Sequence, residues 1–162
     1  MLIINITKME TLILSTKTIS IISAIGMNVI IKTLTSTTNS ICTLITHLTS
    51  YDQPGIEKII KCLKDIDLEF YITVISQLVN EYKDIQVNST IKKALLGVND
   101  ILEEINLELT IIKEAIEYHK TKYFSSWRKI NCKCNINTIK KHKIILENRY
   151  KILVDLLKIN NF

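Results

Sequence analysis

The chain has 162 residues, 47% of them hydrophobic and 23% charged, and its formal net charge is +5. This length suits one domain of ordinary size, and only 3 Gly and 1 Pro exclude collagen-like, linker-rich and turn-rich all-β designs. A count of 32 Ile, 19 Lys and 13 Asn follows AT-rich codons, so Ile or Lys at any single position carries little functional meaning.

The first residues, MLIINITKME, lack the basic region, long apolar core and cleavage site of a secretory leader. Four cysteines in a chain of this length are also fewer than an extracellular disulfide scaffold carries. The sequence therefore predicts an intracellular protein that is not secreted.

Residues 1–50 form an apolar segment rich in Ser and Thr, and Lys32 is the only charged residue between Lys17 and Asp52. Five apolar residues of this segment fall on one helical stripe: Ile30, Leu34, Ile41, Leu44 and Leu48. The uncharged run at 18–31 is shorter than the ~20 residues that span a bilayer. We expect a helix whose Ser/Thr side is covered by neighbouring helices or by another chain.

Residues 52–85 are expected to form two helices. Asp52 is suited to cap the first helix and Pro54 to occupy its first turn. Its apolar stripe is Ile56, Ile59, Ile60, Leu63 and Ile66. Asp67 is then expected to cap a second helix, with the stripe Leu68, Ile72, Ile75, Val79 and Tyr82.

The region 89–159 is predicted to be a long helical hairpin. Its first helix starts at a cap formed by Asn88 or Ser89 and carries a heptad stripe. That stripe is Ile91, Leu95, Val98, Leu102, Ile105, Leu109, Ile112, Ile116 and His119. After a loop at 129–134, Asn135 is expected to cap the last helix. The last helix carries Ile139, Leu146 and Leu153 on its buried stripe, joined by Ile145, Ile152, Tyr150, Leu156 and Leu157.

The predicted fold is therefore all-α, a single-domain bundle of four to six long helices over 1–162. A short connection makes the last two helices antiparallel. The chain from Glu117 to Phe162 holds eleven Lys and Arg against three Asp and Glu, a net charge of +8. Such a basic end suits an acidic protein surface, anionic lipid or nucleic acid.

Aromatic and basic residues gather near the end of the first hairpin helix and early in the last helix. Trp, Tyr and Arg are the residue types that most often dominate interface energetics. The predicted interaction residues are Tyr118, Tyr123, Phe124, Trp127, Arg128, Lys129, Lys140, Lys141 and Lys143. The alternative is that Tyr123, Phe124 and Trp127 close the end of the bundle core.

A structural zinc site is the one metal alternative, with the soft ligands Cys132, Cys134, His142 and His119. CxC is not the usual CxxC knuckle, so reduced loop thiols are the preferred interpretation and no metal is predicted. His47 and His119 fall on apolar stripes and are interpreted as core histidines. The sequence holds no nucleotide-binding, nucleophile-elbow or metalloprotease motif, so we expect no enzymatic activity, no catalytic residues and no cofactor.

Three segments together resemble a small uncharacterised protein of giant, mimivirus-like DNA viruses of amoebae. They are Lys92–Leu102 (KKALLGVNDIL), Ile116–Lys120 (IEYHK) and Tyr123–Arg128 (YFSSWR). The resemblance implies a helical viral protein in the host cytoplasm or the virion, and it supplies no catalytic residues. A second resemblance is topological, to membrane-perturbing four-helix bundles of the HeLo type.

From these observations we expect a non-enzymatic structural or interaction protein that contacts its own copies, as a homo-oligomer, or a virion or host protein. The first alternative is a membrane-active bundle in which residues 10–50 insert and the basic last third binds anionic lipid. The second alternative is electrostatic binding of nucleic acid by the same basic region.

Overall fold

The computed structural model describes residues 26–51, 56–82, 87–122 and 130–160, and within these ranges every regular element is a helix. The helices are α2 (Met27–Thr49), α3 (Glu57–Ile66), α4 (Leu68–Glu81), α5 (Ser89–Lys120) and α6 (Lys133–Asn160). The all-α bundle predicted from the sequence is confirmed.

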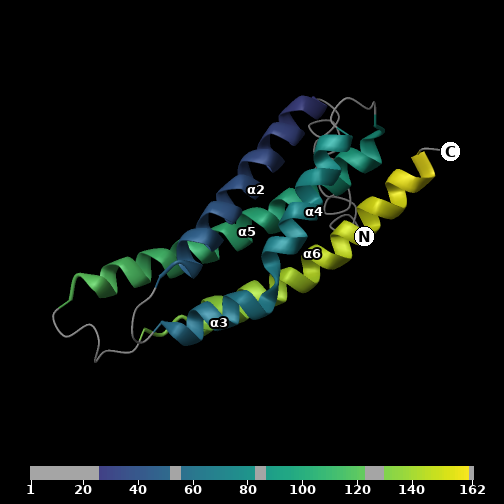
Figure 1. Cartoon of the computed structure of the whole chain (residues 1–162). Helices are drawn as coiled ribbons and strands as arrows, with labels where there is room; N and C mark the ends of the chain where they lie inside the picture. Colours follow the sequence, from purple (N-terminus) through teal and green to yellow (C-terminus); the bar gives the residue numbers. More distant parts are fainter. Residues whose placement is uncertain (1–25, 52–55, 83–86, 123–129, 161–162) are drawn as a thin grey trace, which may run out of the picture.

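The helices α5 and α6 lie side by side and run in opposite directions, which confirms the antiparallel hairpin (Figure 1). Helix α2 lies along α5 in the same direction and also packs on α4. The α3–α4 pair runs back from the end of α2, with α3 packed on both α6 and α2. The core therefore lies between the hairpin and the first three described helices.

The heptad stripe on α5 explains why this helix lies at the centre of the bundle. Its eight aliphatic members, from Ile91 to Ile116, are all buried, with at most 3% of their surface exposed. Asn88 caps the helix, because its Oδ1 accepts a hydrogen bond from the Ile91 backbone N at 2.9 Å. His119 is only half-buried, so the core stripe ends one helical turn before it.

The helix α2 buries a stripe slightly rotated from the predicted one. Ile30, Leu34, Ile41 and Leu48 are buried as expected, but Ile45 is buried where Leu44 is only half-buried. The expected cover of its Ser/Thr side is partial: Thr37 and Thr38 are buried, whereas most of the other hydroxyl residues, such as Thr33, Thr43 and Thr46, are exposed. Many of these hydroxyls donate hydrogen bonds to backbone carbonyls of their own helix.

Two predicted caps differ from the structure. Asp67 separates α3 from α4 in the left-handed conformation, with φ at 52°, and its side chain makes no cap hydrogen bond. Asn135 lies inside α6, which begins at Lys133, and its Nδ2 donates to Glu108 Oε2 of α5 at 2.8 Å. Asp52, the predicted cap, and Pro54, predicted in the first helical turn, lie outside the described residues.

None of the helices in the described residues combines the length and the apolarity that crossing a membrane requires. Within the segment 10–50 that was considered for insertion, residues 10–25 lie outside the described residues.

Candidate interaction surface

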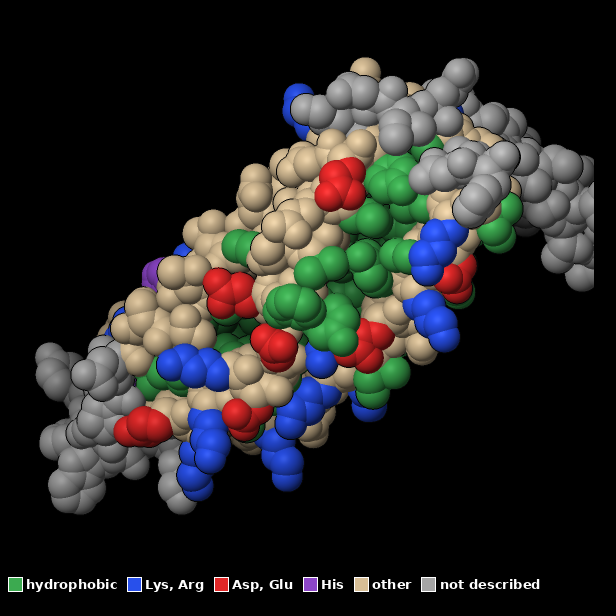
Figure 2. All heavy atoms as spheres, turned by 45° about the vertical axis from the view of Figure 1, so that its right-hand side comes forward, with side chains coloured by type: hydrophobic (Ala, Val, Ile, Leu, Met, Phe, Trp, Pro, Cys, Tyr) green, Lys and Arg blue, Asp and Glu red, His purple; other side chains and the backbone are tan. Residues whose placement is uncertain are grey.

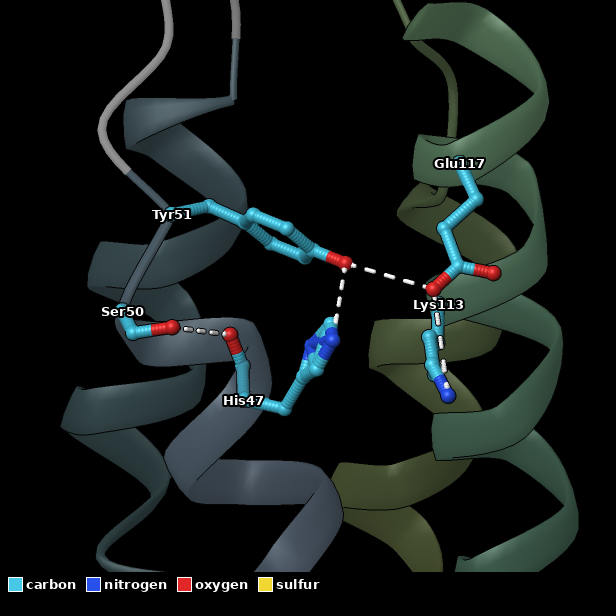
Figure 3. A network of polar contacts seen from close by, with 5 residues as sticks. All are labelled: His47, Ser50, Tyr51, Lys113 and Glu117. Atoms are coloured by element: carbon cyan, nitrogen blue, oxygen red, sulfur yellow. Dashed lines mark hydrogen bonds and ion pairs between the residues drawn. The ribbon is translucent and has the colours of Figure 1, made fainter.

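A network of polar and aromatic contacts joins the last turn of α2 to the last turns of α5 (Figure 3). The Tyr51 ring meets the His47 ring edge-on at 4.8 Å between centroids. The Nζ of Lys120 lies 3.5 Å from the centroid of the same tyrosine ring. One tyrosine therefore contacts both helices at this end of the bundle, through a ring contact and a cation–π contact.

The Tyr51 hydroxyl extends the same network across the helix pair. It lies 3.4 Å from His47 Nε2 and donates to Glu117 Oε1 at 3.5 Å, and Glu117 pairs with Lys113 Nζ at 3.8 Å (Figure 3). Burial, the Glu117 charge and this hydrogen bond raise the pKa of Tyr51 above its ordinary value. The phenol therefore stays protonated at neutral pH and keeps its donor role.

Tyr51 contacts both Glu117 and Lys120, so the network connects α2 to α5 through this tyrosine. His47 was interpreted as a core histidine, but it is only half-buried, and its Nδ1 is buried without a hydrogen-bond partner among the described residues. Sequence reasoning missed the network because Tyr51 and Glu117 are 66 residues apart.

Tyr118 is the described member of the predicted aromatic group, and it points outward. Its side chain is 65% exposed, and the Nζ of Lys122 lies 4.2 Å from its ring centroid. The other predicted interaction residues of this group lie outside the described residues: Tyr123, Phe124, Trp127, Arg128 and Lys129. An exposed ring beside a cation is consistent with a surface role for Tyr118.

The predicted lysines of α6 have different environments. Lys140 and Lys141 are exposed. Lys143 is half-buried, pairs with Glu147 at 3.1 Å and places its Nζ 4.7 Å from the Tyr71 ring centroid. Lys143 is therefore already engaged by Glu147 of its own helix and by Tyr71 of α4, and its docking role stays a prediction.

The four zinc candidates do not form a site. Among the described residues, no three His, Cys, Asp or Glu side chains lie close enough together to hold a metal ion. Cys132 is buried, which raises the pKa of its thiol, whereas Cys134 is exposed two residues later. Because the two cysteines of the CxC motif face different environments, the motif does not present a ligand pair.

The sequence analysis also missed a second apolar stripe on α6. Ile145, Ile152 and Ile159 are spaced seven residues apart and are 39%, 57% and 73% exposed. Ile145 and Ile152 were expected to join the buried stripe, but they are exposed, whereas Leu157 joins Ile139, Leu146 and Leu153 in it as expected. The sequence does contain the signal for this stripe, because two heptad series, one through Leu146 and one through Ile145, run along α6 one position apart.

Exposed apolar side chains are concentrated on the hairpin. Of the nine large hydrophobic residues that are exposed in the described part of the chain, Leu107, Ile111 and Tyr118 lie on α5 and four more lie on α6. Figure 2 shows hydrophobic side chains forming a band along one face, with Asp and Glu side chains along it and Lys and Arg side chains at its lower and right-hand margins. Contiguous apolar surface bordered by charge is typical of interaction sites.

The comparisons with known proteins agree with the resemblance found in the sequence. The chain is similar to an uncharacterised protein of Acanthamoeba polyphaga mimivirus. The two are 26% identical over 153 residues, which cover 77% of this chain and 73% of the relative. No protein-family model and no solved structure matches the chain.

Proposed function

We propose that the protein is a non-enzymatic interaction protein and that it associates with a second copy of itself through the outer stripe of α6. The observation that carries this proposal is the exposure of Ile145, Ile152 and Ile159 at heptad spacing. A heptad-spaced apolar stripe is the pattern with which one helix packs against another.

The geometry of the stripe favours a second copy as the partner. In an antiparallel pairing centred on Ile152, Ile145 of one copy lies opposite Ile159 of the other, so one patch serves both partners. Fully burying an isoleucine contributes about 1.5–3 kcal/mol. Exposed charges of both signs, Lys151 and Asp155, flank the stripe and suit a mixed polar rim.

A pair of matched substitutions tests the proposal. Ile152 and Leu107 are both aliphatic residues, 57% and 54% exposed, but Leu107 lies on α5 and not on the stripe of α6. We expect sedimentation equilibrium to give a dimer for the wild-type chain and for Leu107→Glu, and a monomer for Ile152→Glu. Circular dichroism checks that all three chains keep their helices. A wild-type chain that stays monomeric at high concentration would overturn the proposal.

Anionic membrane is the second candidate partner, and the same stripe favours it because exposed lysines lie beside the isoleucines. In this mode α6 lies in the plane of the interface. Flotation with phosphatidylserine vesicles by a chain that is monomeric in solution would favour this candidate over self-association. Retention on DNA that falls steeply with salt would instead favour the nucleic-acid alternative.

The proposed setting is the interior of an infected cell or the virion, where the partner is a second copy or a virion or host protein. The support is the similarity to a mimivirus protein. Mass spectrometry of purified virions and of infected-cell extracts would separate the two locations.

A further inference from the structure

A pocket of about 330 Å³ lies between α3 and the beginning of α6. Ile59 from α3 and Cys132 and Ile136 from the α6 side line it, and they are 6%, 3% and 7% exposed. These residues give the pocket an apolar floor. The volume is at the lower end of the range for small-molecule sites, which suits one short alkyl chain.

Three lysines also line the pocket. Lys58 comes from α3, while Lys133 and Lys140 are spaced seven residues apart on α6, and all three are exposed. No carboxylate pairs with any of them among the described residues. Like charges gathered without counter-charges create a positive potential that favours an anion.

We propose that this pocket binds an anionic amphiphile with a single alkyl chain. The carboxylate or phosphate head group contacts Lys58, Lys133 and Lys140, and the alkyl chain lies on Ile59 and Ile136. The head group is held at a solvent-accessible position, because all three lysines are exposed. This site lies on the α3 side of α6 and does not include Ile152, so it is independent of the proposed self-association.

Isothermal titration calorimetry on the full chain tests the binding with four probes of equal chain length. Decanoate and decyl phosphate are expected to bind, and the stronger of the two identifies the source of the head group. Decanol and decyltrimethylammonium are expected not to bind, because they lack the negative charge. Equal binding of all four probes, or binding of none, would overturn the proposal.

Substitutions of exposed lysines locate the site. We expect Lys58→Met and Lys140→Met to weaken the binding of the preferred anion by about 10-fold each, the change for loss of one favourable charge contact. Lys61→Met is the matched control, because Lys61 is an exposed lysine of α3 that does not line this pocket. An equal loss in all three variants would show binding to diffuse positive charge and contradict the site.

Cysteine alkylation gives a second readout that does not depend on heat of binding. Cys62 lines the pocket and is half-buried, whereas Cys134 is exposed and outside it. We expect the bound anion to slow the reaction of Cys62 with a maleimide and to leave that of Cys134 unchanged. Slowing of both, or of neither, would place the ligand elsewhere.

Discussion

The helix α2 and the α5–α6 hairpin both bury an apolar stripe, but they treat their polar side chains differently. Among the 23 residues of α2, Lys32 is the only Lys, Arg, Asp or Glu. Its hydroxyls bond within the helix: Thr33 and Thr43 each donate to a carbonyl four residues earlier, at 2.9 Å. The exposed side of α2 is thus polar in composition, although many of its hydroxyl donors are already used.

The hairpin instead combines charged contacts with a continuous apolar seam, formed by the buried stripes of α5 (Ile91 to Ile116) and α6 (Ile139, Leu146 and Leu153). Arg149 of α6 donates to the backbone O of Gly97 on α5, and Lys143 pairs with Glu147 on the outer part of α6. Two hydrogen bonds also join α2 to α5: Thr37 with Asn99, and Ser40 with Asn106. Both regions are therefore held by buried apolar stripes, and they differ in their polar contacts, which come from hydroxyls on α2 and from a guanidinium and an amide on α6.

The seam provides the largest expected effect on stability. Leu102 on α5 is completely buried, so Leu102→Ala is expected to lower the free energy of unfolding by about 2–5 kcal/mol. Leu107→Ala on the same helix, at a position 54% exposed, is expected to change it by less than about 0.5 kcal/mol. Urea unfolding followed by circular dichroism measures both. Similar losses in the two variants would mean that the outer side of α5 is covered in solution.

A smaller effect is expected where the two regions meet. Thr37 is 9% exposed, and its Oγ1 donates both to the Thr33 backbone O of its own helix, at 3.0 Å, and to Oδ1 of Asn99, at 3.3 Å. Thr37→Val keeps the side-chain shape and removes the shared donor, which leaves the oxygen of Asn99, a residue only 5% exposed, without it, so we expect a loss of about 1–3 kcal/mol.

Thr43→Val is the control for this prediction, because the Thr43 hydroxyl donates only to its own helix at an exposed position. Its loss is expected to stay within about 0.5 kcal/mol. Equal losses in the two valine variants would show that the contact to Asn99 does not anchor α2.

The hairpin could be predicted from the sequence because its signals are local. A heptad stripe of more than four repeats and a capping Asn88 specify the α5 helix regardless of its neighbours. The two offset heptad series of α6 could not be assigned in this way, because both are apolar. Only the position of α5 decides that Leu146 is buried and Ile145 is exposed.

The candidate surface was harder to predict than the fold. Tyr118 is exposed, and its docking role stays a prediction, whereas the contacts of Tyr51 depend on the parallel packing of α2 on α5, which no local pattern encodes. The lysine-rich run could not show that Lys143 lies beside Tyr71 and Glu147, because Tyr71 is distant in the sequence.

The smallest expected effect tests whether the Lys143–Glu147 ion pair of α6 contributes to the stability of the chain. Hydrogen bonding from Lys143, with a further contribution from Tyr71, holds the pKa of Glu147 below its ordinary value, although burial acts in the opposite direction. A carboxyl with a lowered folded-state pKa contributes stability above its unfolded pKa and loses it as the pH falls through the folded value.

Glu147→Gln is therefore expected to destabilise the chain at neutral pH by less than about 1 kcal/mol, the upper range for an exposed ion pair. The difference from wild type should shrink below the ordinary Glu pKa and vanish once Glu147 is protonated. Unfolding midpoints measured across this pH range test it. Asp155→Asn is the control, because Asp155 lies 4.0 Å from Lys158 and both side chains are more than half exposed. The effect of Asp155→Asn on stability should be smaller at every pH. If the destabilisation by Glu147→Gln persists in acid, Glu147 stabilises the chain by packing and not by its charge.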